Sequence, residues 1–208
     1  MTDLLSQRGD MDANETQPNI APGGKRDRLI GAAKTLFYQR GVEQTSLADI
    51  AGAADIALGN VYYHFRTKDA LVEAVIAAHG KDILDSLAHL NAESDPRARL
   101  RAYVRGGLKH QTQLARYGCP YGTLCAELDK SGGSAAQSAS TLFNLYLEWL
   151  ERQFRELARP DAAELALETL AAVQGAYVIT QATHSPQHLE RQVARLDRWL
   201  AELEGGAA

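Results

Sequence analysis

The chain has 208 residues, of which 45% are hydrophobic and 23% are charged, and its formal net charge is −4. This length and composition fit one sizeable hydrophobic core or two small ones and exclude a disordered chain. The negative net charge argues against a general nucleic-acid binder, and no apolar run is long enough to predict a membrane-spanning helix.

The first segment, residues 1–24, is polar, contains Pro18, Pro22, Gly23 and Gly24, and shows no helical period. We expect a disordered arm that is either a passive tail or a segment touching DNA, although its acidic residues disfavour DNA contact. The segment also lacks the basic and apolar regions of a signal peptide, so we expect a cytoplasmic protein.

Residues 25–41 have a helical period, in which Leu29, Ala33, Leu36 and Phe37 form one apolar stripe and Gly41 is a suitable C-terminal stop. This helix is expected to support the pair of helices that follows.

Residues 45–68, with the sequence TSLADIAGAADIALGNVYYHFRTK, predict two short helices joined by a tight turn. Ser46 can cap the first helix, with Asp49 as its partner three residues later, and Thr67 can cap a third helix. Val61 and Phe65 have the spacing of inward-facing residues. Tyr62 fits either the core or an exposed position.

The exposed positions of this segment suit DNA contact, because amide and small residues can approach base edges and Tyr, His and Lys can contact phosphates. The candidate DNA-contacting residues are Thr45, Ser46, Leu58, Gly59, Asn60, Tyr62, Tyr63, His64 and Lys68. Between residues 25 and 68 there are seven basic and four acidic residues, so this segment carries an excess of three positive charges and the rest of the chain is strongly negative.

The run from Asn60 to Leu71, NVYYHFRTKDAL, together with LADIA at residues 47–51, resembles the DNA-binding domain of TetR-family transcriptional regulators. The resemblance extends over about residues 25–75. It implies an all-α fold with a helix-turn-helix domain at residues 25–70 and a helical effector-binding and dimerisation domain at residues 71–208. It also implies a homodimer that contacts its partner copy through the last two helices.

Beyond this domain the period predicts helices at about 68–90, 96–117, 120–130, 134–158, 161–184 and 186–203, which makes about nine helices in all. Gly106 and Gly107 lie inside one of them, where glycine destabilises a helix. Either a close helix approach or a ligand cavity would explain the pair.

The last two predicted helices carry apolar residues that repeat at intervals of three and four, which is typical of a helical seam. We expect a dimer interface formed by Leu170, Val173, Leu189, Val193, Leu196 and Leu200. The alternative is that both helices close the core of their own chain.

Effector binding requires polar groups on otherwise apolar faces of the middle helices. The candidate ligand-binding residues are Tyr103, Gln111, Cys119, Tyr121, Tyr146, Trp149 and Tyr177, with His110, Asn144 and Gln174 as further positions. Which of them converge cannot be read from the pattern.

Cys119 lies between Gly118 and Pro120, at the expected N-cap of a helix, where free N–H groups can lower a thiol pKa. The segment GCPYGTL resembles the entry to the sixth helix in TetR members that respond to electrophiles and oxidants. A reactive sensor and a plain buried cysteine are both open. Cys125 is six residues away and out of disulfide reach on one helix, so both are expected to be thiols.

These features favour a ligand-responsive regulator, most simply a repressor, that binds a palindromic operator as a homodimer and is released by a small molecule or reactive species. The alternative is a helical scaffold or an enzyme that has lost DNA binding. The sequence has no nucleophile elbow or phosphate-binding loop, and Pro186 breaks the helix between His184 and His188, so we expect no catalytic residue, metal site or cofactor.

Overall fold

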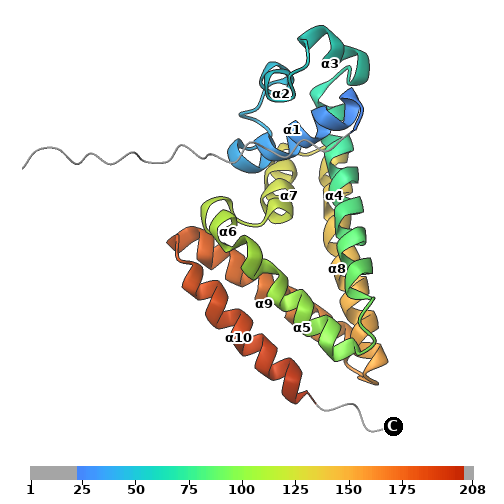
Figure 1. The fold of residues 1–208 in the computed structure, drawn as a ribbon, viewed down its shortest axis with the longest axis vertical. Helices are drawn as coiled ribbons and strands as arrows, with labels where there is room; N and C mark the ends of the chain where they lie inside the picture. Colours follow the sequence, from blue (N-terminus) through green and yellow to red (C-terminus); the bar gives the residue numbers. More distant parts are fainter. Residues whose placement is uncertain (1–22, 204–208) are drawn as a thin grey trace, which may run out of the picture.

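The computed structural model describes residues 23–203, so nearly all of the predicted N-terminal arm lies outside the described residues. Ten α-helices and one 3₁₀-helix make up this part of the chain, which confirms the all-α prediction (Figure 1). They are α1 (Lys25–Arg40), α2 (Leu47–Ala53), α3 (Leu58–His64), α4 (Lys68–Leu90), α5 (Pro96–Gly106), η1 (Gly107–His110), α6 (Gln111–Tyr117), α7 (Pro120–Ser131), α8 (Ser134–Glu156), α9 (Ala162–Thr183) and α10 (Pro186–Glu202).

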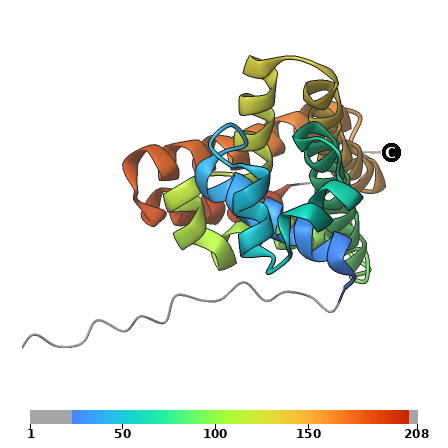
Figure 2. The same ribbon diagram turned by 90° about the horizontal axis from the view of Figure 1, so that it is seen from above.

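The N-terminal helices α1, α2 and α3 form a small unit at one end of the molecule (Figure 1). Its core contains the predicted α1 stripe together with Ile50, Val61 and Phe65, all of which are buried. Gly41 ends α1 with a φ of 87°, a left-handed conformation that glycine adopts without strain. The view from above shows these three helices lying across the end of the remaining helices (Figure 2).

The long helices α4 and α8 run side by side from this unit to the far end of the molecule (Figure 1). Helix α9 packs against α8, α10 and α6 and is therefore the central helix of the C-terminal region. Helix α9 is long and apolar enough to cross a membrane. Its packing against three other helices also accounts for apolar residues along it.

The predicted single helix at 96–117 is wrong, because the chain forms α5, the 3₁₀-helix η1 and α6 in succession. The break falls at Gly107, which is buried. A Cβ atom at this position would clash with the hydroxyl and ring of Tyr177. A close approach of α9 therefore explains Gly107, whereas Gly106 has open space around it.

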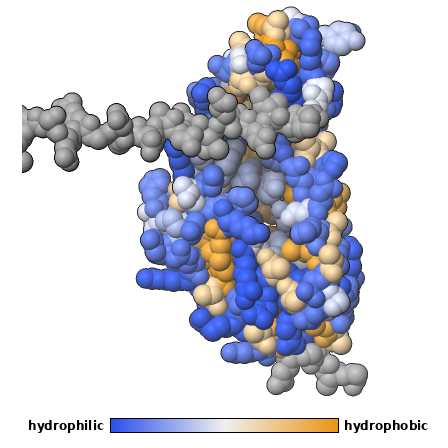
Figure 3. Space-filling view, viewed as in Figure 1, coloured by the Kyte–Doolittle hydropathy of each residue, from blue (hydrophilic) through white to orange (hydrophobic). Residues whose placement is uncertain are grey.

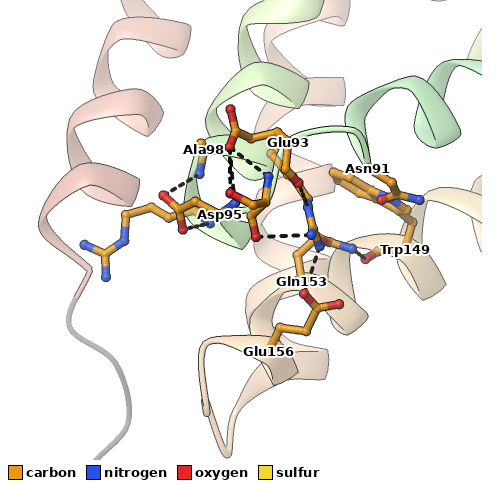
Figure 4. Close-up of polar contacts among 10 residues, drawn as sticks. Asn91, Glu93, Asp95, Ala98, Trp149, Gln153 and Glu156 are labelled. Carbon is orange, nitrogen blue, oxygen red and sulfur yellow. Dashed lines mark hydrogen bonds and ion pairs between the residues drawn. The ribbon is translucent and has the colours of Figure 1, made fainter.

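Hydrogen bonds to Glu93, Gln153 and Glu156 fix the turn between α4 and α5 (Figure 4). The Arg99 guanidinium donates to the Glu93 carbonyl at 2.6 Å, to Gln153 Oε1 at 2.9 Å and to the Glu156 carboxylate at 2.8 Å. Next to it, Trp149 Nε1 donates to Oδ1 of Asn91, the C-cap residue of α4, at 2.9 Å. These bonds tie the C-terminal end of α4 to α8.

The predicted dimer seam closes the core of its own chain. Each of its residues has at most 5% of its surface exposed: Leu170, Val173, Leu189, Val193, Leu196 and Leu200. The assignment of these six residues to a dimer interface is therefore wrong, because side chains buried within one chain have no surface left for a second copy. Apolar periodicity does not tell which neighbour covers a helix.

Candidate functional site

Helix α2 starts with the capping box that the sequence predicts. The Ser46 hydroxyl accepts from the Asp49 backbone N–H at 3.1 Å, and the Asp49 carboxylate accepts from the Ser46 backbone N–H at 2.8 Å. The Ser46 hydroxyl also donates to the Asp49 carboxylate, and this bond, together with the one from the Ser46 backbone N–H, lowers the pKa of the Asp49 carboxyl. The cap fixes where α2 begins.

Helix α3 buries only Val61 and leaves most of its surface to solvent. Leu58 is 41% exposed, Tyr62 52% and Tyr63 84%, while Gly59 and Asn60 are also exposed. In the space-filling view, apolar residues gather at the end of the molecule that α2 and α3 form (Figure 3). An exposed face of this kind on a short helix is suited to contact with another molecule.

Two predicted DNA contacts need comment. Thr45 is 1% exposed and its hydroxyl donates to the Gly41 carbonyl at 2.7 Å, so its side chain belongs to the loop structure and is not available to DNA. Tyr62 is exposed, which decides against its core alternative, whereas Phe65 is buried as expected. The Tyr63 and His64 rings make an edge contact at 5.1 Å.

Basic groups flank this face. Thr67 caps α4, as predicted, and Lys68 is the first residue of the helix. The Lys68 Nζ donates to the Glu43 carbonyl at 3.3 Å and the side chain is half-buried. Arg66 is exposed beside it. Basic groups close to the N-terminus of a helix, where backbone N–H groups are free, favour contact with phosphate.

The candidate ligand residues fall into two sets, and the larger is an aromatic cluster at the centre of the C-terminal region. The Tyr103 ring lies 5.7 Å from Tyr146 and 5.8 Å from Trp149, and Tyr146 lies 6.1 Å from Tyr121. Tyr121 in turn makes an edge contact with His79 of α4 at 5.1 Å. The structure therefore brings four predicted residues together, and burial raises the pKa of each of the three tyrosines.

Two further candidates, Tyr177 and Gln111, are partly buried. Tyr177 is half-buried against Gly107, and burial raises its pKa. The Gln111 Oε1 atom is buried and has no hydrogen-bond partner. His110 and Asn144, by contrast, are exposed.

Cys119 belongs to the second set, in a groove of about 630 Å³ between α7, α8 and α9. Its volume lies in the range of small-molecule sites. The groove has an apolar wall with a few polar groups, formed by Cys119, Gly122, Thr123, Cys125, Ala126, Asp129, Ala136, Ser140, Phe143, Gln174, Val178 and Gln181. A smaller hollow of about 350 Å³ lies between α4 and α8 and reaches Trp149.

Of the two alternatives for Cys119, the structure favours the buried cysteine over the reactive sensor. Cys119 is the N-cap of α7, as predicted, and its Sγ accepts from the Gly122 N–H at 3.4 Å. The residue is only 7% exposed, however, and burial outweighs the hydrogen bonds and raises the thiol pKa. Both cysteines are free thiols, and burial also raises the pKa of Cys125, to about 11.

Sequence reasoning missed the residues that join the two parts of the molecule. The Tyr38 hydroxyl of α1 donates to the Gly118 carbonyl at 2.8 Å, and the Glu127 carboxylate of α7 accepts two backbone N–H groups of the α1–α2 loop. Neither residue has a motif around it that indicates such a contact.

Within residues 23–203, no group of three or more His, Cys, Asp or Glu side chains is placed to hold a metal ion.

Two family models match the chain. The model for bacterial regulatory proteins of the tetR family matches residues 29–75, and the model for the C-terminal domain of LmrA/YxaF-like transcriptional regulators matches residues 96–195. The first match contains α2 and α3, and the second contains the aromatic cluster apart from His79.

The chain is similar to named transcriptional regulators over part of their sequence. The HTH-type transcriptional repressor KstR2 of Rhodococcus jostii is 30% identical over 135 residues, which are 64% of this chain and 61% of that protein. The HTH-type transcriptional regulator TtgR of Pseudomonas putida is 47% identical over 51 residues, 24% of each chain. The chain thus spans less than two thirds of the length of these relatives.

Solved structures share the fold over nearly their whole length. A TetR transcriptional regulator from Legionella pneumophila superimposes with a TM-score of 0.76 at 23% identity, covering 85% of this chain and 97% of that one. The reduced form of E. coli NemR gives 0.76 at 21% identity, covering 85% and 96%. With the helix-turn-helix geometry and both family models in agreement, the chain belongs to the TetR family of bacterial regulatory proteins.

Proposed function

We propose that this protein is a cytoplasmic transcriptional regulator that binds a palindromic operator as a homodimer and is released by a small molecule. The main observation is the exposed face of α3, where Tyr63 is 84% exposed at the end of a helix fixed by a buried Val61. Repression is favoured as the output because the relative KstR2 is named a repressor.

The DNA surface that we propose contains the predicted residues except Thr45: Ser46, Leu58, Gly59, Asn60, Tyr62, Tyr63, His64 and Lys68. Few of these side chains offer strong hydrogen bonds to base edges. Much of the affinity should therefore come from phosphate contacts and fall steeply as salt rises.

DNA binding is tested with a duplex selected from a random-sequence library by the wild-type chain. Replacing Tyr63 and Lys68 together with alanine should lower the affinity for this duplex by at least about tenfold, because it removes an aromatic and a cationic phosphate contact. Sedimentation should show an unchanged oligomeric state. A scaffold or an enzyme would select no duplex from the library. That outcome would contradict the proposed DNA binding.

The dimer that we propose uses the outer face of α9. Leu167 is 59% exposed, Val178 63% and Ile179 53%, and the exposed small residues Ala171 and Gly175 lie between them. Small residues at these positions would let a second helix approach closely, and an apolar helix face of this kind is costly to leave in water.

Replacing Leu167 and Ile179 together with glutamate should shift the protein to a monomer in sedimentation and weaken DNA binding, since like charges would face each other across a twofold axis. Leu84→Glu is the matched control, because Leu84 of α4 is similarly exposed at 53% but lies on another helix. A dimer that survives the double substitution would exclude this face.

The small-molecule site that we propose is the 630 Å³ groove, with Cys119, Gln174 and Phe143 as contacts. The aromatic cluster forms the packed layer beside it. A Phe143→Ala variant should bind an effector more weakly, whereas operator affinity without effector should stay within about twofold of wild type.

A further inference from the structure

The loop between α1 and α2 is held by a carboxylate from the C-terminal region. Glu127 Oε2 accepts from the Val42 N–H at 2.9 Å, and Oε1 accepts from the Glu43 N–H at 2.7 Å. Each carboxylate oxygen therefore satisfies one backbone donor of the same loop. Such charge-assisted bonds are stronger than those between neutral groups.

Other groups hold the same loop from further sides. Gly41 has a φ of 87°, and a Cβ atom there would lie 3.0 Å from Glu127 Oε2, so glycine allows the carboxylate to approach. On the side of α4, the Lys68 Nζ donates to the Glu43 carbonyl at 3.3 Å. Since Ser46 caps α2 directly after this loop, the position of residues 41–44 sets where α2 and α3 begin.

Helix α7 also forms one wall of the groove. Thr123 and Ala126, close to Glu127 in sequence, line it, and so does Cys119 at the start of the helix. Gly118, directly before Cys119, accepts the hydrogen bond from Tyr38 of α1. The start of α7 and Glu127 in its second half are therefore both linked to the N-terminal unit, while residues from Cys119 to Asp129 line the groove.

We propose that Glu127 is a positioning residue for DNA binding, which couples the groove to the helix-turn-helix. With the groove empty, its carboxylate holds the α1–α2 loop in the arrangement that presents α3. An occupant that displaces α7 withdraws the carboxylate, frees the Val42 and Glu43 N–H groups and weakens DNA binding. This inference rests on the proposed regulator function and specifies how its effector acts.

Hydrogen exchange of the full-length chain without DNA tests the contact itself. The Val42 and Glu43 amides should exchange at least about fivefold faster in Glu127→Ala than in wild type, with Glu127→Gln between them because its amide keeps one acceptor oxygen. Glu190→Gln, which removes an exposed carboxylate of α10, is the matched control and should leave both amides unchanged. Unchanged exchange in Glu127→Ala would overturn the proposal.

Affinity for the selected duplex should follow the same order. We expect a loss of about fivefold or more in Glu127→Ala and a smaller loss in Glu127→Gln, in the range typical of coupling between sites. Thermal melting should show that both variants stay folded at the temperature of the assay. Equal affinities for all three chains, despite faster exchange in the variants, would show that the contact does not position α3 and would overturn the proposal.

In a third experiment, a bulky side chain is introduced into the groove to take the place of an effector. Ser140→Trp on α8 should speed exchange of the Val42 and Glu43 amides in the wild-type background but have no further effect in Glu127→Ala. Gln137→Trp, on the same helix but outside the groove, should have no effect in either background.

Additive effects of Ser140→Trp in both backgrounds would overturn the coupling. If the wild-type chain selects no duplex, the proposed function fails. The exchange experiments still decide in that case whether Glu127 links the groove to the loop.

Discussion

The tyrosines of α3 and those of the aromatic cluster have opposite environments. On α3, Tyr62 and Tyr63 are exposed, whereas the Tyr146 ring contacts both Tyr103 and Tyr121, and Tyr103 also contacts Trp149. The difference lies in their neighbours: α3 has seven residues and packs on one side only, while the cluster lies among α4, α5, α7 and α8. An aromatic residue at the surface of a short helix adds little to folding and is available to a partner.

The largest expected effect comes from removing a ring of the buried cluster. Trp149→Ala should lower the free energy of unfolding by about 3–5 kcal/mol, because Trp149 is 3% exposed and also donates to Asn91. Denaturant unfolding measures this loss. A change below 1 kcal/mol would mean that the cluster is loosely packed and closer in character to the α3 tyrosines.

A second effect concerns His79, whose ring contacts Tyr121. Burial, together with the nearby Lys34 ammonium and against the Asp82 carboxylate, lowers the pKa of His79 to about 4. The unfolded chain takes up this proton near its ordinary pKa of about 6.5, so stability should fall as pH drops from about 6.5 to 4, by at most about 3 kcal/mol.

Unfolding free energies at several pH values measure this slope, and His79→Gln should remove it. A slope that persists in His79→Gln would assign the effect to other groups. The cluster would then tolerate a charged imidazolium.

The smallest effect on stability is expected at the exposed ring. Tyr63→Ala should change the free energy of unfolding by no more than about 0.5 kcal/mol, because the side chain is 84% exposed. Binding of the selected duplex should nevertheless weaken by about tenfold, and Tyr63→Phe should show how much of this comes from the hydroxyl. A loss of stability comparable to that of Trp149→Ala would remove the contrast between the two regions.

The helix-turn-helix could be predicted closely from the sequence because its signals are local. The Ser46–Asp49 cap, the Gly41 stop and the Thr67 cap each depend on residues within a few positions of one another. The long-range features were harder. The Tyr177 side chain lies against Gly107, 70 positions earlier in the chain, where the predicted helix is broken. No local period indicates that contact.

The candidate site was predicted unevenly for the same reason. The cap position of Cys119 followed from Gly118 and Pro120, but its pKa depends on burial by helices distant in sequence. The six residues predicted for the dimer seam have the spacing of a helical interface. The interface that they form lies between helices of the same chain. Leu167 and Val178, which are exposed, lie on the same helix but outside that seam.

The hydrogen bond between Trp149 and Asn91 has a mechanical consequence for α4. It fixes one end of a 23-residue helix, which at 1.5 Å per residue is about 34 Å long. A rotation of about 5° around this pivot would move Lys68, at the other end, by roughly 3 Å. In a twofold dimer two such lever arms would add their displacements, so a small tilt at the pivot is enough to change the span between the two α3 helices.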